Sequence, residues 1–364
     1  MRRHAHQSQH NAKPKSHVRS IAHGAGLAGI IGGILLLQAC DASGVANALE
    51  DYRWRVGNVL DQRVAPEVRA VPVYPRRRAR RVASTDLRLS PGEALSLRDC
   101  LGRLLGERNS ILGQVMTPSS RFAYETRVAA ALSGCEADSD EESALLERVR
   151  RSKSTDLAVA GYDVIFNTEE IERFLSPEAS PMEMQGVHGG LLGIAALDEL
   201  VGLVRRGLDG DGVGEAALSA SLQRLRESRE AGGLLRTAAL FVAELEAVAA
   251  IIHARLNARP VCLQPRPTPT AEIAETVFHK FYARGVQPDL ASLRRELAKL
   301  VAVLGQAANV QAAELPRPLT AYLEAVQRLD ASLVDASRTH AEAWQRLLGQ
   351  CGRMPDRSDS DNGA

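Results

Sequence analysis

The chain has 364 residues, of which 45 are basic and 44 acidic, so its formal net charge at pH 7 is only +1. This balance excludes the broad positive field that is typical of nucleic-acid-binding proteins. Aromatic residues make up 4% of the chain, while Ala, Leu, Arg and Glu are abundant. The composition therefore favours helices over sheets, and we predict an all-α fold.

The first forty residues have the pattern of a lipoprotein signal. Basic residues without any acidic residue precede an uncharged apolar run from Leu27 to Leu37, which continues as Gln-Ala-Cys to Cys40. A helix of about eleven residues is roughly 16 Å long and is too short for a ~30 Å hydrocarbon core. We therefore expect residues 1–39 to be cleaved and Cys40 to become a lipidated N-terminus.

This interpretation places the rest of the chain in the cell envelope, on the periplasmic side, with the membrane as a partner through the lipid. Asp41, directly after the cysteine, slightly favours the inner membrane. The competing interpretation is a permanent anchor, because residues 21–39 carry no charge and are just long enough to span a bilayer.

Residues 40–89 are expected to hold the lipidated N-terminus, one short helix and a spacer. Apolar residues recur every three or four positions from 41 to 63, which predicts the helix. Three prolines then exclude a helix, and residues 76–81 are arginine except for Ala79. We expect a solvated linker here. An alternative role for the arginines is attraction to anionic lipid headgroups.

The helical body is predicted to span residues 90–352. Its first helix starts with Ser-Pro-Gly-Glu at 90–93, which supplies a cap, a proline for the first turn and a capping-box glutamate. Apolar residues at helical spacing continue this helix to Val115. A second helix starts at Thr117 and completes an antiparallel hairpin over residues 90–135.

Four cysteines follow Cys40, and an even number in an exported chain indicates two disulfides. In the hairpin, Cys100 and Cys135 lie at similar distances from the turn and therefore at the same level. We predict a disulfide between them. The competing interpretation of these cysteines is buried free thiols.

Between the hairpin and residue 231 the pattern is less regular. We expect a helix over 143–160, a short strand-like run over 162–166, and two further helices over 168–174 and 191–206.

A Gly/Asp-rich segment at 209–214 resembles the opening of a calcium loop. The positions that need oxygen ligands hold Val213 and Ala220 instead. We therefore expect a turn between helices, and we predict no metal site and no cofactor.

The C-terminal part, residues 231–352, shows the clearest periodicity. Its apolar residues form three helical stripes, the second of which Pro288 interrupts. Three antiparallel helices bring the C-terminal ends of the first and the third together. Cys262 and Cys351 lie at these ends, so we predict the second disulfide there. Residues 353–364 are acidic and polar, and we expect them to be disordered.

Several distinctive stretches are scattered over most of the chain. They are Gly106–Ser110, Arg121–Glu125, Val277–Tyr282, Val286–Pro288 and Trp344–Cys351. In these stretches the chain resembles a family of proteobacterial lipoproteins known as domain of unknown function 3080. The resemblance implies export, a helical body and a lipid anchor, and it implies no activity.

No catalytic motif of fixed spacing occurs in the sequence. His340 lies on the apolar stripe of the last helix, where we expect a core histidine with satisfied hydrogen bonds. If the distinctive stretches meet in space, they form a candidate pocket. Its residues are Arg108, Asn109, Arg121, Glu125, His279, Lys280 and Tyr282. The competing interpretation is structural, since Arg–Glu pairs and asparagine hydrogen bonds also hold helices together.

We therefore expect a lipid-anchored helical envelope protein that binds a small ligand or an envelope protein partner, without catalysis of its own and without nucleic acid. The alternative is a periplasmic hydrolase or transferase with a site around His279, Arg108 and Glu125. This alternative requires a concave pocket that holds His279 with a carboxylate and a nucleophile.

Overall fold

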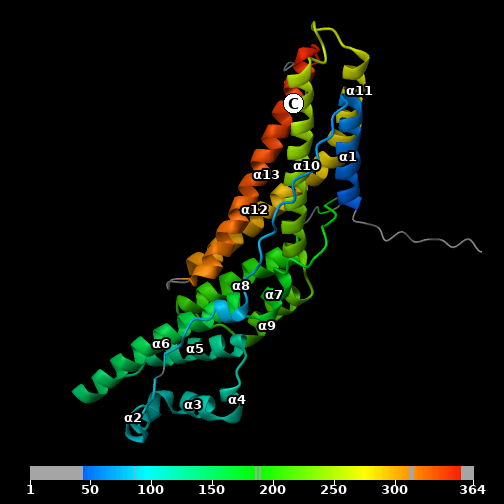
Figure 1. Cartoon of the computed structure of the whole chain (residues 1–364). Coiled ribbons are helices and arrows are strands. Elements are labelled where there is room, and N and C mark those ends of the chain that lie inside the picture. Colours follow the sequence, from blue (N-terminus) through cyan, green and yellow to red (C-terminus); the bar gives the residue numbers. More distant parts are fainter. Residues whose placement is uncertain (1–43, 86, 185–186, 188–189, 311–314, 354–364) are drawn as a thin grey trace, which may run out of the picture. The chain divides into compact units, whose positions relative to one another are not determined.

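Every regular element in the described part of the chain is a helix, which confirms the predicted all-α fold (Figure 1). The computed structural model describes residues 44–85, 87–184, 187, 190–310 and 315–353, all within a compact unit that spans 42–364. The predicted signal segment, Cys40, Asp41 and the tail after Arg353 lie outside these residues.

The helices are α1 (Gly44–Leu60), η1 (Arg77–Ala79), α2 (Pro91–Ser96), α3 (Arg98–Asn109), α4 (Ile111–Gln114), α5 (Pro118–Ser133), α6 (Asp140–Phe166), α7 (Glu169–Phe174), α8 (Leu192–Leu208), α9 (Glu215–Arg226), α10 (Glu230–Ala258), α11 (Pro269–Val277), η2 (Phe278–Val286), α12 (Gln287–Val310) and α13 (Arg317–Gln350). Among the described helices, none combines the length and the apolarity that a bilayer crossing requires.

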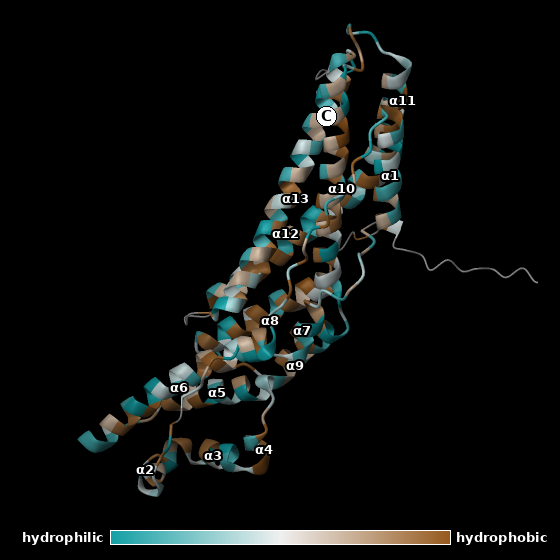
Figure 2. Cartoon of the chain, in the orientation of Figure 1, coloured by the Kyte–Doolittle hydropathy of each residue, from teal (hydrophilic) through white to brown (hydrophobic). Residues whose placement is uncertain are grey.

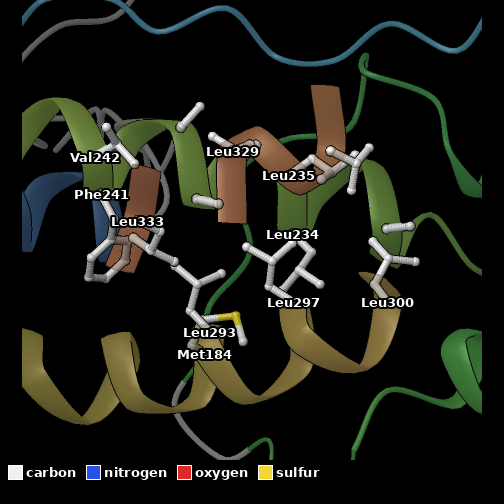
Figure 3. Packing of buried hydrophobic residues seen from close by; sticks show 14 of the residues in the cluster. Met184, Leu234, Leu235, Phe241, Val242, Leu293, Leu297, Leu300, Leu329 and Leu333 are labelled. Atoms are coloured by element: carbon white, nitrogen blue, oxygen red, sulfur yellow. The ribbon is translucent and has the colours of Figure 1, made fainter. Parts of the chain in front are cut away.

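The main core forms where the long helices α10, α12 and α13 pack side by side (Figure 1). Apolar residues recur along each of these helices at helical spacing (Figure 2). Figure 3 shows the interior of this contact, where Phe241 and Leu234 of α10 meet Leu293 and Leu297 of α12 and Leu333 of α13. Because α1 packs on α10 as well, α10 is buried along most of its length.

Both predicted disulfides are present. Cys262 and Cys351 join the segment after α10 to the end of α13, with their Cα atoms 5.3 Å apart. Cys100 of α3 and Cys135, just after α5, have their Cα atoms 5.7 Å apart. Both separations are usual for disulfides. The pairing predicted from helical geometry is therefore confirmed.

The single helix predicted from 90 to 115 is wrong, because the segment is divided into α2, α3 and α4. The predicted capping box at its start is present. The division between α3 and α4 occurs where the hydroxyl of Ser110 caps a new helix. As a result Ile111 and Val115, which we expected on an apolar face, are exposed.

The strand-like run 162–166 is helical and forms the last turns of α6, which corrects the prediction. α6 packs against α5 and α8, and Val164, Ile165 and Phe166 are at most 1% exposed. Burial against other helices outweighs the moderate strand preference of β-branched and aromatic residues.

Pro288 does not interrupt the helix, contrary to the prediction. The chain stays helical from α11 to α12 because the middle part, η2, is a π-helix. At its end the N–H of Gln287 donates to the carbonyl of Tyr282, five residues earlier. The wider turn accommodates a proline that has no N–H and would crowd a carbonyl in α-helical geometry.

Residues 62–85, which we call the strap, pack against the helices instead of forming the expected solvated spacer. The hydroxyl of Tyr74 donates to the carbonyl of Phe166 at 2.9 Å. Arg80 is 1% exposed, and its Nε donates to the same carbonyl at 2.9 Å. Its guanidinium also pairs with Glu172 of α7 at 2.5 Å and lies 4.3 Å from the centre of the Tyr74 ring. A buried arginine therefore anchors the strap.

A buried cluster of rings connects α1 to α13. The indole N–H of Trp344 donates to the hydroxyl of Tyr52 at 2.8 Å, and this hydroxyl lies 2.8 Å from Nε2 of His340. The ring of Tyr282 packs on His340 with 4.4 Å between centres. His340 is completely buried, as expected for a core histidine, but the expectation that all its hydrogen bonds are satisfied is wrong, because its Nδ1 has no partner among the described residues. Burial lowers its pKa to about 3.

Acid should destabilise the fold through His340. A histidine in an unfolded chain has a pKa of about 6.5. Below that pH His340 is therefore protonated in the unfolded chain but stays neutral in the folded chain. The stabilisation is complete above pH 6.5 and is lost as the pH falls towards 3. Between pH 7 and pH 5 the wild type should lose about 2 kcal/mol more unfolding free energy than His340→Gln. Urea denaturation at both pH values measures this, and equal losses would contradict it.

Candidate functional site

An open cavity of about 780 Å³ is lined by the end of the strap, the segment 87–89, and residues of helices α2 to α6. We call it the α5–α6 cavity. Its polar lining residues are Ser84, Thr85, Arg88, Arg108, Asn109, Gln114, Arg121, Tyr124, Lys153, Asp156 and Asp163. Its volume lies in the usual range of small-ligand sites.

A cluster of four charged side chains lies at one wall of the cavity: Arg121, Lys153 and Asp156 line the cavity, and the buried Glu125 pairs with the two cations. Arg121 and Glu125 are four residues apart on α5, and Lys153 and Asp156 are three apart on α6, so each pair shares one helix face. Oε1 of Glu125 lies 2.5 Å from Arg121 and 3.3 Å from Lys153. Asp156 lies 3.0 Å from Lys153 and accepts hydrogen bonds from the N–H and the hydroxyl of Thr85, at 3.0 and 2.7 Å. The cluster thus connects both helices to the strap.

Two carboxyl groups of this region have raised pKa values. Burial raises the pKa of Glu125, although the nearby Lys153 and Arg121 lower it. Its second oxygen, Oε2, has no hydrogen-bond partner within the described residues. Burial also raises the pKa of Asp163, whose carboxylate accepts from Asn167 at 2.6 Å. Shifted carboxyls beside a cavity are common at functional sites.

The α3 side of the cavity holds two of the predicted residues. Arg108 is half-buried, and its guanidinium donates to the carbonyl of Gly113 in α4, while Asn109 is exposed at the end of α3. Tyr124 of α5 donates to the carbonyl of Leu104 at 3.2 Å, and burial raises its pKa to about 12. Tyr124 therefore stays neutral near pH 7 and contributes to packing between α3 and α5.

The structure does not bring the other three predicted residues to this cavity. His279, Lys280 and Tyr282 lie in η2, which packs against α1, α11 and α12. His279 and Lys280 are exposed, and Tyr282 belongs to the ring cluster around His340. The combined site that the catalytic alternative requires, with His279 beside the arginines and carboxylates of the cavity, is not formed.

A comparison with protein families covers most of the chain. The family model described as Protein of unknown function (DUF3080) matches residues 49–355. The chain belongs to this family. The match starts within α1 and includes the α5–α6 cavity and both disulfides, and it confirms that the chain resembles this family of unknown function. No curated protein and no solved structure matches the chain.

Sequence reasoning on this DUF3080 chain missed Lys153, Asp156 and Asp163. A signal for them was present, because Asp163 stands in an otherwise apolar stretch, and Asp156 is one helical turn from Lys153. Assigning 162–166 to a strand hid the signal of Asp163, whereas Lys153 and Asp156 already lay in the helix expected over 143–160. If residues 140–166 are taken as one helix, Lys153, Asp156 and Asp163 all belong to α6. Because α6 packs against α5, these residues are then expected to lie near Arg121 and Glu125.

Metal binding finds no support in the described part of this DUF3080 fold, where no three His, Cys, Asp or Glu side chains are grouped to hold an ion. The Gly/Asp-rich segment 209–214 is a loop between α8 and α9, as expected.

Proposed function

We propose that this DUF3080 protein is a lipid-anchored envelope protein on the periplasmic side that binds an anionic ligand in the α5–α6 cavity. The observation that carries the proposal is the cationic lining of the cavity. Arg88, Arg108, Arg121 and Lys153 line it together with two carboxylates, Asp156 and Asp163.

The cationic groups keep donor capacity for a ligand. An arginine offers five N–H donors and a lysine three. The ion pairs of Arg121 with Glu125 and Asp156 both involve a single nitrogen, Nη2. The side chain of Arg121 is 22% exposed, although the carboxylates with which it pairs are buried. Glu125 and Asp156 thus hold the arginine in place, and its other donors suit a carboxylate or a phosphate.

Anion binding can be tested with Arg108→Ala. We expect glutamate, citrate or inorganic phosphate to bind the wild type, and the variant to bind the best of them about 10- to 100-fold more weakly, as for the loss of one charge-assisted hydrogen bond. Isothermal titration calorimetry measures the dissociation constants. The control is Arg328→Ala, which removes an exposed arginine of α13. Absence of binding by all three anions, or equal binding by Arg108→Ala, would contradict the proposal.

Export and lipid attachment are supported by the leader pattern and by the two disulfides, since disulfides persist in oxidising compartments. We expect Cys40→Ser to abolish labelling of the protein with radioactive palmitate in cells and to leave an unprocessed precursor. Fractionation of the envelope then tests whether Asp41 retains the wild type in the inner membrane. Unchanged labelling of Cys40→Ser would refute lipidation at this residue.

A further inference from the structure

The α5–α6 cavity lies next to a second cavity of about 500 Å³. Ser84 and Asp163 line both of them, so the two share a boundary. The second cavity is bordered by Arg77 and Arg81 of the strap and by Pro118 at the start of α5. We call the two cavities together the trough. Each part alone has the size of a small-ligand site, so the whole suits a longer molecule.

Cationic side chains occur in both parts of the trough. Arg77, Arg81, Arg88, Arg108, Arg121 and Lys153 line it, against the carboxylates Asp156 and Asp163. Arg77 pairs with Glu172 through a contact that is half-exposed. Arg81 is exposed, and its charge lowers the pKa of Asp163. Burial has the larger effect, so the pKa of Asp163 is still raised. The excess of positive charge favours a ligand whose negative charges recur along its length.

The strap forms one wall of the trough, and its backbone is extended there. The carbonyl of Arg80 accepts from Tyr162 at 2.6 Å, and five residues later Thr85 bonds to Ser152 and Asp156. These partners lie six to ten residues apart on α6, which is about 9–15 Å along its axis. Five helical steps would cover only about 7.5 Å, so the strap is stretched here.

In the stretched part of the strap, some backbone N–H and C=O groups are unpaired within the described part of the chain. Val82, Ala83 and Ser84 make no backbone hydrogen bond to any other described residue, and Ala83 and Ser84 are exposed. All three line the second cavity. An extended segment with unpaired N–H and C=O groups accepts another extended chain alongside it, as at the edge of a sheet.

We propose that the trough binds an extended acidic peptide, whose backbone pairs with Val82–Ser84 and whose carboxylates meet the arginines on both sides. This inference rests on the proposed function, since it specifies the anion of the α5–α6 cavity. A peptide fits better than an anionic glycan or lipid because only a peptide presents alternating N–H and C=O groups to the strap.

The test uses the full mature protein and a fluorescein-labelled octapeptide that alternates Glu and Ala. Fluorescence anisotropy near physiological ionic strength, where long-range attraction is screened, measures its binding. We expect the octapeptide to bind at least about tenfold more tightly than glutamate or a Gln–Ala octapeptide, which compete as unlabelled molecules. Polygalacturonate, an anionic glycan, is expected to compete poorly.

Two variants separate charge from backbone pairing. Arg81→Ala should weaken the octapeptide by about tenfold, whereas Arg78→Ala, which removes an exposed arginine of the same run, should leave binding unchanged. Ala83→Pro removes one backbone N–H without changing the charge. It should weaken the octapeptide and leave glutamate binding as in the wild type, and an unchanged melting temperature shows that the strap is intact.

The outcomes distinguish this inference from the proposed function. If glutamate binds as tightly as the octapeptide, the cavity binds small anions and the peptide inference is wrong. Equal competition by polygalacturonate, or full octapeptide binding by an intact Ala83→Pro, also overturns it. If no anion binds at all, the proposed function fails together with the inference.

Discussion

Replacing Cys262 and Cys351 together with serine should lower the free energy of unfolding by about 4.6 kcal/mol. The two cysteines are 89 residues apart, and joining them removes many conformations from the unfolded chain. Both residues are buried at the ends of α10 and α13, so the native contact remains and the unfolded state gains freedom. A typical domain is stable by about 5–15 kcal/mol, which makes this loss a large part of the total.

Equilibrium urea denaturation of the oxidised wild type and of the double serine variant measures the difference. The matched control is the pair Cys100→Ser and Cys135→Ser, which opens a loop of 35 residues and should cost about 3.8 kcal/mol. Dithiothreitol should destabilise the wild type and leave a variant that lacks all four cysteines unchanged. Equal stability of the oxidised wild type and the Cys262/Cys351 variant would contradict the expected loop effect.

Arg80→Ala should cost about 2–5 kcal/mol, the range for truncating a large buried side chain. The side chain of Arg80 bonds to the carbonyls of Phe166 and Pro75, pairs with Glu172 and packs on the ring of Tyr74. Its charge also lies at the C-terminal end of α6, where the helix dipole favours a cation. Without it the strap loses its main anchor, and the peptide-binding wall of the trough should loosen with it.

Chemical denaturation measures the stability change, and limited trypsin digestion measures release of the strap. Arg78→Ala is the control, because Arg78 belongs to the same run and is exposed, so its loss should change stability by less than about 0.5 kcal/mol. Arg80→Lys keeps the charge but lacks the planar fork, so it should recover only part of the stability. If Arg80→Ala and Arg78→Ala are equally stable and equally resistant to trypsin, the strap is not anchored as described.

Local patterns predicted the elements that depend on neighbouring residues. The capping box at 90–93 and the helical stripes of the C-terminal part are set by contacts within one helix or between residues a few positions apart. The Cys100–Cys135 disulfide also followed from helix lengths within one hairpin, whereas the Cys262–Cys351 disulfide followed from the antiparallel order of three helices. The errors at 162–166 and at Pro288 arose where packing or a π-helix outweighed local preference.

Four of the seven predicted site residues lie together in the structure. Arg108, Asn109, Arg121 and Glu125 belong to adjoining helices of the N-terminal hairpin, so their sequence proximity carries over into space. The residues around His279 were assigned to the same pocket only because they stood out in the sequence. The helix that carries them, η2, packs against other helices. The places that they were expected to fill in the pocket are taken by residues of α6 and the strap.

The sequence by itself determined the helical class, the cysteine pairs and the family, since composition, period and spacing are properties of short stretches. Tertiary structure alone decided the roles of Arg80 and Glu125. A row of arginines has the same pattern whether solvent or protein surrounds it, and only packing buries Arg80 among Phe166, Glu172 and Tyr74. The charge of a carboxyl group likewise depends on which helices cover it, because burial and distant cations set its pKa.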